Sequence, residues 1–435
     1  MTPQQRLATR ELFGIKLGLE AIGALVAELQ HPERSFLPVI VAGTNGKGSV
    51  TAMVARSLRA AGVHVGRYTS PHLVHLRERF AIDDVDIADA QLDAALHAVF
   101  EAEDALLARG VLAHPTTYFE LTTAAALVAF RDAGVRVGVL EVGLGGRHDA
   151  TNVVAAPYAA ITSIAFDHMA QLGDTLEAIA TEKAGVIKAG ATVVSGVTQD
   201  GPARIIADVC ARQGAHLVSA GDGVLVDAHE VAGETTVRLR TPLREYGPVA
   251  LALRGEHQVG NALVAVRLLE MLEAGGVGGG LEAITDGLAQ ATWPGRLERR
   301  SLSGGADLVL DGAHNPAGAE ALARWLRTAG FAPMTLLIGC MRDKDVAGLL
   351  APLLPLADRV VATSVAFPRA LPANELAARV RDLAPHLDVQ VVPDAAHALA
   401  VATTTAPRVV VAGSLLLVGA VRAALADHPE PRNPA

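Results

Sequence analysis

The sequence predicts an α/β protein with two domains. The chain has 435 residues, which is more than one hydrophobic core usually organises. Apolar residues make up 51% of it and aromatic residues only 3%, so we expect an interior of Ala, Val, Leu and Ile on alternating strands and helices. Apolar runs of strand length also alternate with helical patterns along most of the chain.

The first half shows repeated strand, loop and helix units. Residues 38–43 form a short apolar run that ends in glycine. A helical pattern follows it, with one apolar face made of Val50, Met53, Val54, Leu58 and Ala61. Residues 136–141 and 159–164 are expected to be buried parallel strands, and 175–188 to form a helix capped by Asp174. This repetition is typical of a doubly wound sheet.

The pattern changes between residues 217 and 253. Short alternating pieces such as 235–240, broken by glycines, predict a small antiparallel sheet inserted into the first domain. The glycine-rich stretch 275–280 and a further helix lead to the turn 293–296, which we interpret as the domain junction.

A second α/β domain is expected beyond the junction. Its five strands are predicted at residues 308–310, 335–338, 359–362, 389–392 and 409–412. The predicted domains are therefore 1–293 and 297–428, followed by a proline-rich tail at 429–435.

Charge and cysteine content exclude several functions. The net charge is −9 with mixed signs throughout, so no basic field is present to attract nucleic acid. Cys210 and Cys340 lack metal-ligand or CxxC spacing, which favours a reducing cytoplasm. No apolar run reaches the roughly 20 residues of a membrane span, and the first residues do not resemble a signal peptide. We expect a cytoplasmic monomer without nucleic-acid or membrane partners.

The segment Gly43-Thr44-Asn45-Gly46-Lys47-Gly48-Ser49 lies where a phosphate-binding loop belongs, between a buried strand and a helix. Glycines let backbone N–H groups surround phosphate oxygens, the helix N-terminus favours negative charge, and Lys47 can neutralise the β- and γ-phosphates. The string departs from GxxxxGK[ST], because Val41 occupies the first glycine position and Gly48 separates Lys47 from Ser49. The alternative is an ordinary glycine-rich turn that caps a helix.

A magnesium site is expected at the carboxyl edge of the sheet. Glu141 ends an apolar strand there, and Ser70 would add an oxygen ligand beside Lys47. His168 follows another strand and Lys183 lies on the next helix, so both can reach the same edge. The alternatives are a strand-end salt bridge for Glu141, a turn role for Ser70, a hydrogen-bonded histidine and a solvated lysine.

Side chains around the junction are placed to meet a nucleotide from the opposite side. Arg296 suits a γ-phosphate, Asp311 ribose hydroxyls, and Asn261 adenine or a phosphate oxygen, with His314 close to Asp311. Turn and cap roles are the alternative for these residues.

An ordered set of motifs resembles the folylpolyglutamate synthase/dihydrofolate synthase family of the Mur-ligase superfamily. The motifs are GTNGKGS at 43–49, YTSPHL at 68–73, TYFE at 117–120, EVGLGGR at 141–147, DATN at 149–152, DH at 167–168, EKAG at 182–185, HQ at 257–258 with Asn261, PGR at 294–296 and DGAHNP at 311–316. They span nearly the whole chain and keep the family's order.

The resemblance implies a Mur-ligase-like P-loop ATP-binding domain with a small inserted β-sheet, followed by a smaller Rossmann-like α/β domain. It implies an ATP-dependent ligase, with two Mg²⁺ ions, that adds L-glutamate to folate or dihydropteroate through an acyl-phosphate. Lys47, Lys183 and His314 are then catalytic, and His168 with a carbamylated Lys183 forms a second magnesium site. The implied acceptor site comprises Gly18, Leu19, Glu20, Thr117, Tyr118, Phe119, Glu120, His148, Asp149 and Ala150, although the family commonly has Leu at position 148.

Two alternatives remain at this level. A Mur-superfamily ligase of cell-wall synthesis shares the chemistry, but the residues before position 38 are too few for the substrate domain that such ligases usually add. A nucleotide-switched binding protein is the other, and no NKxD-type string supports it. The sequence leaves open whether one or both folate reactions are catalysed.

Overall fold

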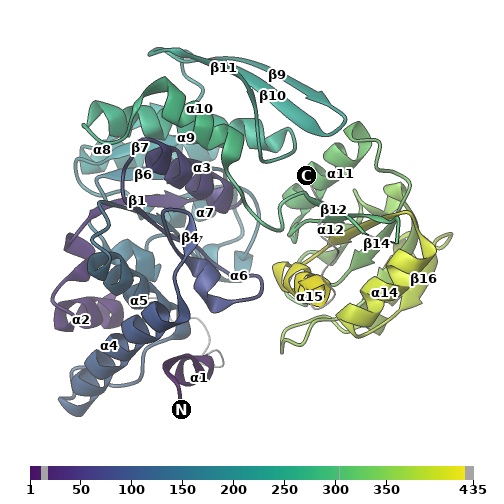
Figure 1. Cartoon of the computed structure of the whole chain (residues 1–435), viewed down its shortest axis with the longest axis horizontal. Helices are drawn as coiled ribbons and strands as arrows, with labels where there is room; N and C mark the ends of the chain where they lie inside the picture. Colours follow the sequence, from purple (N-terminus) through teal and green to yellow (C-terminus); the bar gives the residue numbers. More distant parts are fainter. Residues whose placement is uncertain (11–17, 303, 427–435) are drawn as a thin grey trace.

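The computed structural model describes residues 1–10, 18–302 and 304–426, and these residues build two α/β units with a narrow sheet reaching from one to the other (Figure 1). The tail predicted at 429–435 lies outside the described residues.

The first unit contains an eight-stranded sheet with the order β4-β3-β2-β5-β1-β6-β7-β8. Its strands are β1 (Leu37–Ala42), β2 (Val65–Tyr68), β3 (Phe80–Ile82), β4 (Val85–Asp86), β5 (Val137–Glu141), β6 (Tyr158–Ile161), β7 (Thr192–Ser195) and β8 (His216–Ser219). The strands from β2 to β8 in this order are parallel, and β3 and β4 form an antiparallel edge. β1 lies between β5 and β6, so the segments after these three strands meet at one edge.

Helices cover both faces of this sheet, as a doubly wound fold requires. On one face, Ile40 and Leu140 pack against α1 (Pro3–Ala8), α2 (Glu20–Glu28), α4 (Asp89–Ala108), α5 (Tyr118–Asp132), α7 (Leu176–Ala184) and α8 (Asp200–Gln213). On the other face, Val39 and Val139 pack against α3 (Lys47–Ala60), α9 (His257–Ala274) and α10 (Gly280–Gln290). Successive residues of one strand face opposite layers, which is why these strands are apolar throughout.

Two predicted boundaries in this unit are wrong. The helix predicted over 175–188 is α7, which ends at Ala184, and its cap is Thr175, whose hydroxyl accepts from Ala178 N, rather than Asp174. The antiparallel sheet does not begin at residue 217, because residues 216–219 form β8 and pair in parallel with β7. The sheet itself is confirmed as β9 (Leu225–Val231), β10 (Glu234–Arg240) and β11 (Glu245–Ala250).

The second unit is built on a six-stranded sheet with the order β12-β13-β17-β14-β15-β16. Its strands are β12 (Glu298–Ser301), β13 (Asp307–Leu310), β14 (Met334–Ile338), β15 (Ala357–Ala362), β16 (Asp388–Val391) and β17 (Arg408–Ala412). Its helices are α11 (Pro316–Thr328), α12 (Val346–Leu350), α13 (Ala373–Leu383), α14 (Ala395–Thr405) and α15 (Leu415–Ala426). All five predicted strands are present. β12 was missed because its sequence, Glu-Arg-Arg-Ser, is an exposed antiparallel edge without apolar residues.

No described helix combines the length and apolarity that a membrane span requires.

Candidate active site

A cavity of about 1110 Å³ lies between the two units, and both of them line it. The first unit contributes the loop after β1, the ends of β5 and β6, and the start of α9. The second contributes residues after β13, β14 and β17. Side chains far apart in sequence therefore face one space.

Hydrogen bonds with the segment after β6 fix the conformation of the loop after β1. Thr44 N donates to Ser163 O at 2.8 Å, and Asn45 N donates to Ser163 Oγ at 3.1 Å. Gly46, which precedes α3, has φ +87°. A Cβ on Gly46 would lie 2.2 Å from Asn261 Oδ1. The loop thus presents a helix N-terminus to the cavity, which suits a phosphate group.

Trp293 explains why this loop departs from the usual phosphate-loop string. A Cβ on Gly48 would lie 2.5 Å from Trp293 Cε2, so only glycine fits beneath the indole. Ser49, one residue later, is buried and accepts from Gln258 Nε2 at 3.2 Å. The extra glycine is therefore a packing requirement of the junction.

Lys47 and Lys183 both reach the loop's own carbonyl oxygens. Lys47 Nζ donates to Gly43 O and Thr44 O at 3.1 Å, and Lys183 Nζ donates to Gly43 O at 2.9 Å. Burial and the charge of Lys47 lower the pKa of Lys183 to about 7. A large share of Lys183 is then a neutral amine near neutral pH.

Glu141 and Ser70 lie together at the carboxyl edge of the sheet, as expected. Ser70 N donates to Glu141 Oε2 at 3.2 Å, and the Glu141 carboxylate is buried. Burial raises the pKa of Glu141 and lowers that of Lys47, while the charge of each opposes the other's shift. A buried carboxylate beside a phosphate loop offers the hard oxygen that Mg²⁺ prefers.

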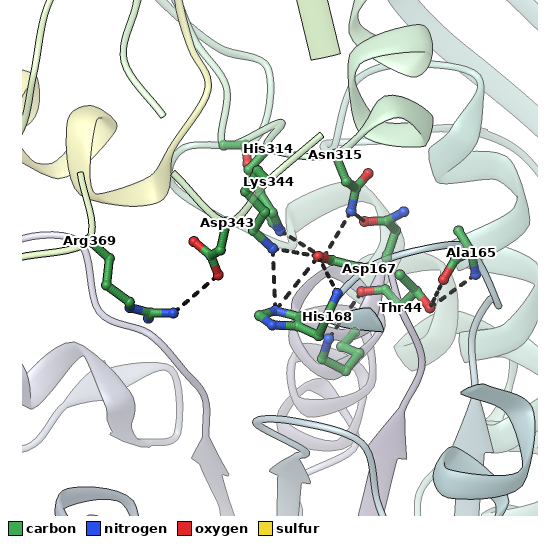
Figure 2. A network of polar contacts seen from close by, with 12 residues as sticks. Thr44, Ala165, Asp167, His168, His314, Asn315, Asp343, Lys344 and Arg369 are labelled. Atoms are coloured by element: carbon green, nitrogen blue, oxygen red, sulfur yellow. Dashed lines mark hydrogen bonds and ion pairs between the residues drawn. The ribbon is translucent and has the colours of Figure 1, made fainter. Parts of the chain in front are cut away.

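Asp167 forms the centre of a polar network between the units (Figure 2). Lys344 Nζ lies 2.5 Å from Asp167 Oδ1, and Asn315 Nδ2 donates to Asp167 Oδ2 at 3.2 Å. His314 Nε2 lies 3.3 Å from the same Oδ2 atom. Burial alone would raise the pKa of Asp167, but His314 and Lys344 hold it well below its ordinary value.

His168 borders this network. Its Nε2 atom lies 3.4 Å from Lys344 Nζ, and burial lowers its pKa to about 4, which leaves a neutral imidazole. His168 adopts φ +50°, an uncommon conformation for a residue other than glycine, and precedes the short helix α6 (Met169–Leu172). A neutral imidazole facing the cavity can serve as a ligand.

The junction residues Arg296 and Asp311 are also brought to the cavity. A Cβ on Gly312 would lie 2.2 Å from Arg296 Nη1, so the guanidinium lies directly over this glycine. Both oxygens of Asp311 accept backbone N–H groups, from Leu297 at 2.9 Å and Ala313 at 2.8 Å. Asp311 therefore ties the junction to the second unit, and its expected contact with ribose stays a prediction.

The residues expected to bind the acceptor do not all line the cavity. Tyr118 lines the cavity, and Arg79 stacks over its ring at 5.2 Å. Thr117 and Glu120 form a capping box at the start of α5, in which Glu120 Oε2 accepts from both Thr117 N and Oγ1 at 2.7 Å. Phe119 packs beside Gly143 and is not among the described lining residues.

The remaining acceptor residues lie away from the described cavity lining. Asp149 is buried and accepts from Leu144 N at 2.8 Å and from Thr151 N at 3.0 Å, so it shapes the loop after β5. Ala150 is buried, His148 is exposed, Glu20 begins α2, Leu19 is the N-cap of that helix and Gly18 precedes it. Their roles in binding stay predictions.

Lys344 was not identified from the sequence, although a signal was present. The chain contains 32 arginines but only five lysines, at positions 16, 47, 183, 188 and 344. Lys47, Lys183 and Lys344 all line this cavity. Three of the four lysines that the structure describes therefore lie at the site, where a compact ammonium group suits phosphate and carboxylate partners. Lys188 instead donates to Asn152 O.

The arrangement fits a nucleotide with magnesium. Among the described residues, no three His, Cys, Asp or Glu side chains gather as an all-protein metal cage. Mg²⁺ commonly takes one or two protein oxygens and completes its shell with phosphate oxygens and water, and Glu141 with Ser70 matches that pattern.

Two family models match the chain. Residues 41–269 match the Mur ligase middle domain, and residues 295–415 match the Mur ligase glutamate ligase domain. The fold and the site therefore define an ATP-dependent ligase of the Mur type.

Individual relatives narrow this class. A dihydrofolate synthase/folylpolyglutamate synthase of Bacillus subtilis is 36% identical, covering 84% of this chain and 85% of that protein. The structure of Mycobacterium tuberculosis folylpolyglutamate synthase complexed with ADP is 34% identical, with a TM-score of 0.90 over 99% of this chain and 98% of that one. A Yersinia pestis folylpolyglutamate synthase/dihydrofolate synthase complexed with AMPPNP and a Mn ion is 32% identical, with a TM-score of 0.84 over 98% of both chains. This chain belongs to the dihydrofolate synthase/folylpolyglutamate synthase family.

Proposed function

We propose that the protein joins L-glutamate to the terminal carboxylate of a folate, with dihydropteroate as a second acceptor. The observation that carries this proposal is the shared cavity. In it, the phosphate loop, with Lys47 and with Lys183 from α7, faces Lys344 and His314 of the unit that matches the glutamate ligase model. The family relationship supports the choice of acceptor.

The reaction requires activation because a carboxylate is a poor electrophile. Transfer of the γ-phosphoryl group of ATP to the acceptor carboxylate gives an acyl-phosphate and ADP. The glutamate amine then attacks the acyl carbon and loses a proton, and the C–O bond to phosphate breaks. The products are an amide and inorganic phosphate.

Different residues of the chain would bind the phosphates and the metal ion. We assign the phosphates to the backbone N–H groups at the start of α3 and to Lys47, with Arg296 at the γ-phosphate. Glu141 and Ser70 would hold magnesium, which spreads the negative charge of the transferring phosphoryl group. Asn261, at the start of α9, lies against the phosphate loop, where it can reach the nucleotide.

A second metal position is part of the proposal. His168 and Lys183 line the same cavity, and the low pKa of Lys183 supports its conversion to a carbamate. The ammonium group first loses a proton, and the neutral amine nitrogen then adds to CO₂ and loses a second proton. Overall a charge of +1 is replaced with −1, and oxygen ligands are created.

We further propose that residues 1–293 and 297–428 act as two domains that close on ATP. A cytoplasmic location is also proposed, which the two free, buried cysteines Cys210 and Cys340 support.

Parallel turnover assays test the function. ADP release is measured with ATP, L-glutamate and either tetrahydrofolate or dihydropteroate, and each reaction should require both acceptor and glutamate for complete turnover. Stimulation by muramyl precursors but by neither pteroate nor folate would overturn the acceptor assignment. Phosphate release independent of glutamate and of every folate would instead indicate a nucleotide switch.

A further inference from the structure

The first unit holds α11 of the second unit at both of its ends. At the N-terminal end, Asn315 Nδ2 donates to Asn45 Oδ1 at 3.1 Å, in addition to its bond with Asp167. At the C-terminal end, Trp325 contacts Gly233 in the turn between β9 and β10, and Thr328 contacts Glu230 near the end of β9. With 13 residues, α11 spans about 20 Å between these contacts.

The contact at the C-terminal end is close and specific. Trp325 Nε1 donates to Gly233 O at 3.0 Å, and the tryptophan is only 2% exposed. Gly233 has φ +83°, and a Cβ there would lie 2.9 Å from Trp325 Cζ2 and 3.0 Å from Ala329 Cβ. Glycine is therefore required both by the backbone conformation and by the approach of α11.

The three-stranded sheet is also fixed at its opposite end. Glu270 of α9 is buried, and its Oε1 atom accepts from Tyr246 OH at 2.9 Å and from Thr241 Oγ1 at 2.5 Å. The same helix carries Gln258 and Asn261 at its start, beside the phosphate loop. The sheet thus connects the helix behind the phosphate loop with the far end of α11, as its place across the two units shows (Figure 1).

None of the described residues of this sheet lines the cavity, so an effect on the reaction must be transmitted through a helix that the sheet contacts. Gly233 makes its contact with α11. A helix held at its far end has a fixed tilt, and its tilt sets the position of its N-cap. The N-cap is Asn315, and His314 precedes it. Both residues must reach Asp167 from the other unit for the network in Figure 2 to form.

We infer that Gly233 and Trp325 are positioning residues, which orient α11 so that Asn315 and His314 meet Asp167 and the phosphate loop. The activity readout of this inference rests on the proposed ligase function. The contact acts on the geometry of the closed site and leaves nucleotide binding by the first unit intact.

Gly233→Ala tests the inference, with Gly110→Ala as the matched control. Gly110 also has positive φ, +71°, but a Cβ there meets nothing within 4 Å. The control carries the backbone strain without the displacement of α11. We expect Gly233→Ala to lower kcat by about 10- to 100-fold, because small misplacements far from the chemistry have effects of this size. The Kd for ATP should stay close to that of the control. Equal kcat values for the two variants would overturn the inference.

A double-mutant cycle separates positioning from a general loss of stability. Trp325→Phe removes the ring atoms that a Gly233→Ala methyl would meet, and it also removes the hydrogen bond to Gly233 O. It should therefore lower kcat by itself, and the double variant should lose less than the two single losses combined. Additive losses in kcat would contradict a direct coupling of these two residues.

Two structural measurements test the positioning role without an activity assay. The chain contains two tryptophans, so in a Trp293→Phe background Trp325 alone reports on the contact. Gly233→Ala should make Trp325 more accessible to acrylamide quenching and enlarge the radius of gyration in small-angle scattering, relative to Gly110→Ala. If the wild type turns over no folate or pteroate, the proposed function fails, and these measurements still test the positioning role. Unchanged quenching and scattering would refute it.

Discussion

Lys344 Nζ lies 2.5 Å from Asp167 Oδ1, and this ion pair joins the two units beside the proposed metal ligand His168. Both side chains are nearly buried, at 10% and 8% exposure. The pair therefore stabilises the arrangement in which the two halves of the cavity face each other.

Lys344→Met should separate the reaction from nucleotide binding. Loss of a hydrogen-bonded charge from a buried carboxylate should cost about 1–3 kcal/mol in the free energy of unfolding. Turnover should fall strongly, whereas the Kd for ATP should change little because the phosphate loop belongs to the first unit. Isothermal titration with the ATP analogue AMPPNP and steady-state kinetics measure both quantities.

Arg342→Met is the control for Lys344→Met. Arg342 lies two residues earlier, is 56% exposed and pairs with Glu375. It should keep nearly normal stability and turnover. Similar losses in the two variants would show that the position of Lys344 between the units has no special effect.

Lys47→Ala should reduce turnover by several orders of magnitude while the protein stays folded. Lys47 Nζ donates to two carbonyl oxygens of its own loop, so its removal takes away charge at the phosphoryl group rather than core packing. Circular dichroism and thermal melting establish folding, and ADP release measures turnover. Near-normal activity in a folded variant would rule out the phosphate-loop interpretation.

The enzyme should require CO₂ for full activity, because CO₂ converts Lys183 into the proposed carbamate. Because its pKa is lowered to about 7, the neutral amine that reacts with CO₂ becomes the major form as pH rises through that value. Enzyme prepared in CO₂-depleted buffer should lose activity and regain it on addition of bicarbonate, and mass spectrometry under native conditions should detect the added carboxyl group.

Lys183→Ala tests the proposed carbamate by mutation. The Kd for ATP should stay largely unchanged because Lys47 and Glu141 remain, whereas turnover should be lost. A small carboxylate such as acetate should restore part of it. A fully active alanine variant would eliminate the carbamate.

Thr117 and Tyr118 are adjacent, but replacing each by alanine should affect a different property, stability for Thr117 and folate binding for Tyr118. Thr117→Ala removes the N-cap of α5 and should lower the free energy of unfolding by about 1 kcal/mol, with little change in the KM of the folate. Tyr118→Ala should raise that KM, since Tyr118 faces the cavity. Urea unfolding and acceptor titrations distinguish the two. A large KM change in Thr117→Ala would favour direct contact of Thr117 with the acceptor.

Sequence patterns predicted most of the fold because they report on local and periodic properties. Buried parallel strands such as β1 and β5 are apolar throughout, and the loop after β1 carries its glycines and lysine in one short segment. β12 and the end of α7 escaped prediction because a charged edge strand lacks a hydrophobic pattern and helix ends depend on local caps.

The sequence by itself therefore determined the α/β class, the phosphate loop and the chemical types of Lys47, Glu141 and His168, since these depend on residue identity and on strand and helix order. Only the tertiary structure decided that Lys344 and Asp167, 177 positions apart, form an ion pair. It also decided that Trp325 meets Gly233 at the far end of α11. The physical reason is that hydrogen bonds and ion pairs are short-ranged, so which groups meet depends on how the two units pack, and local periodicity carries no information about that packing.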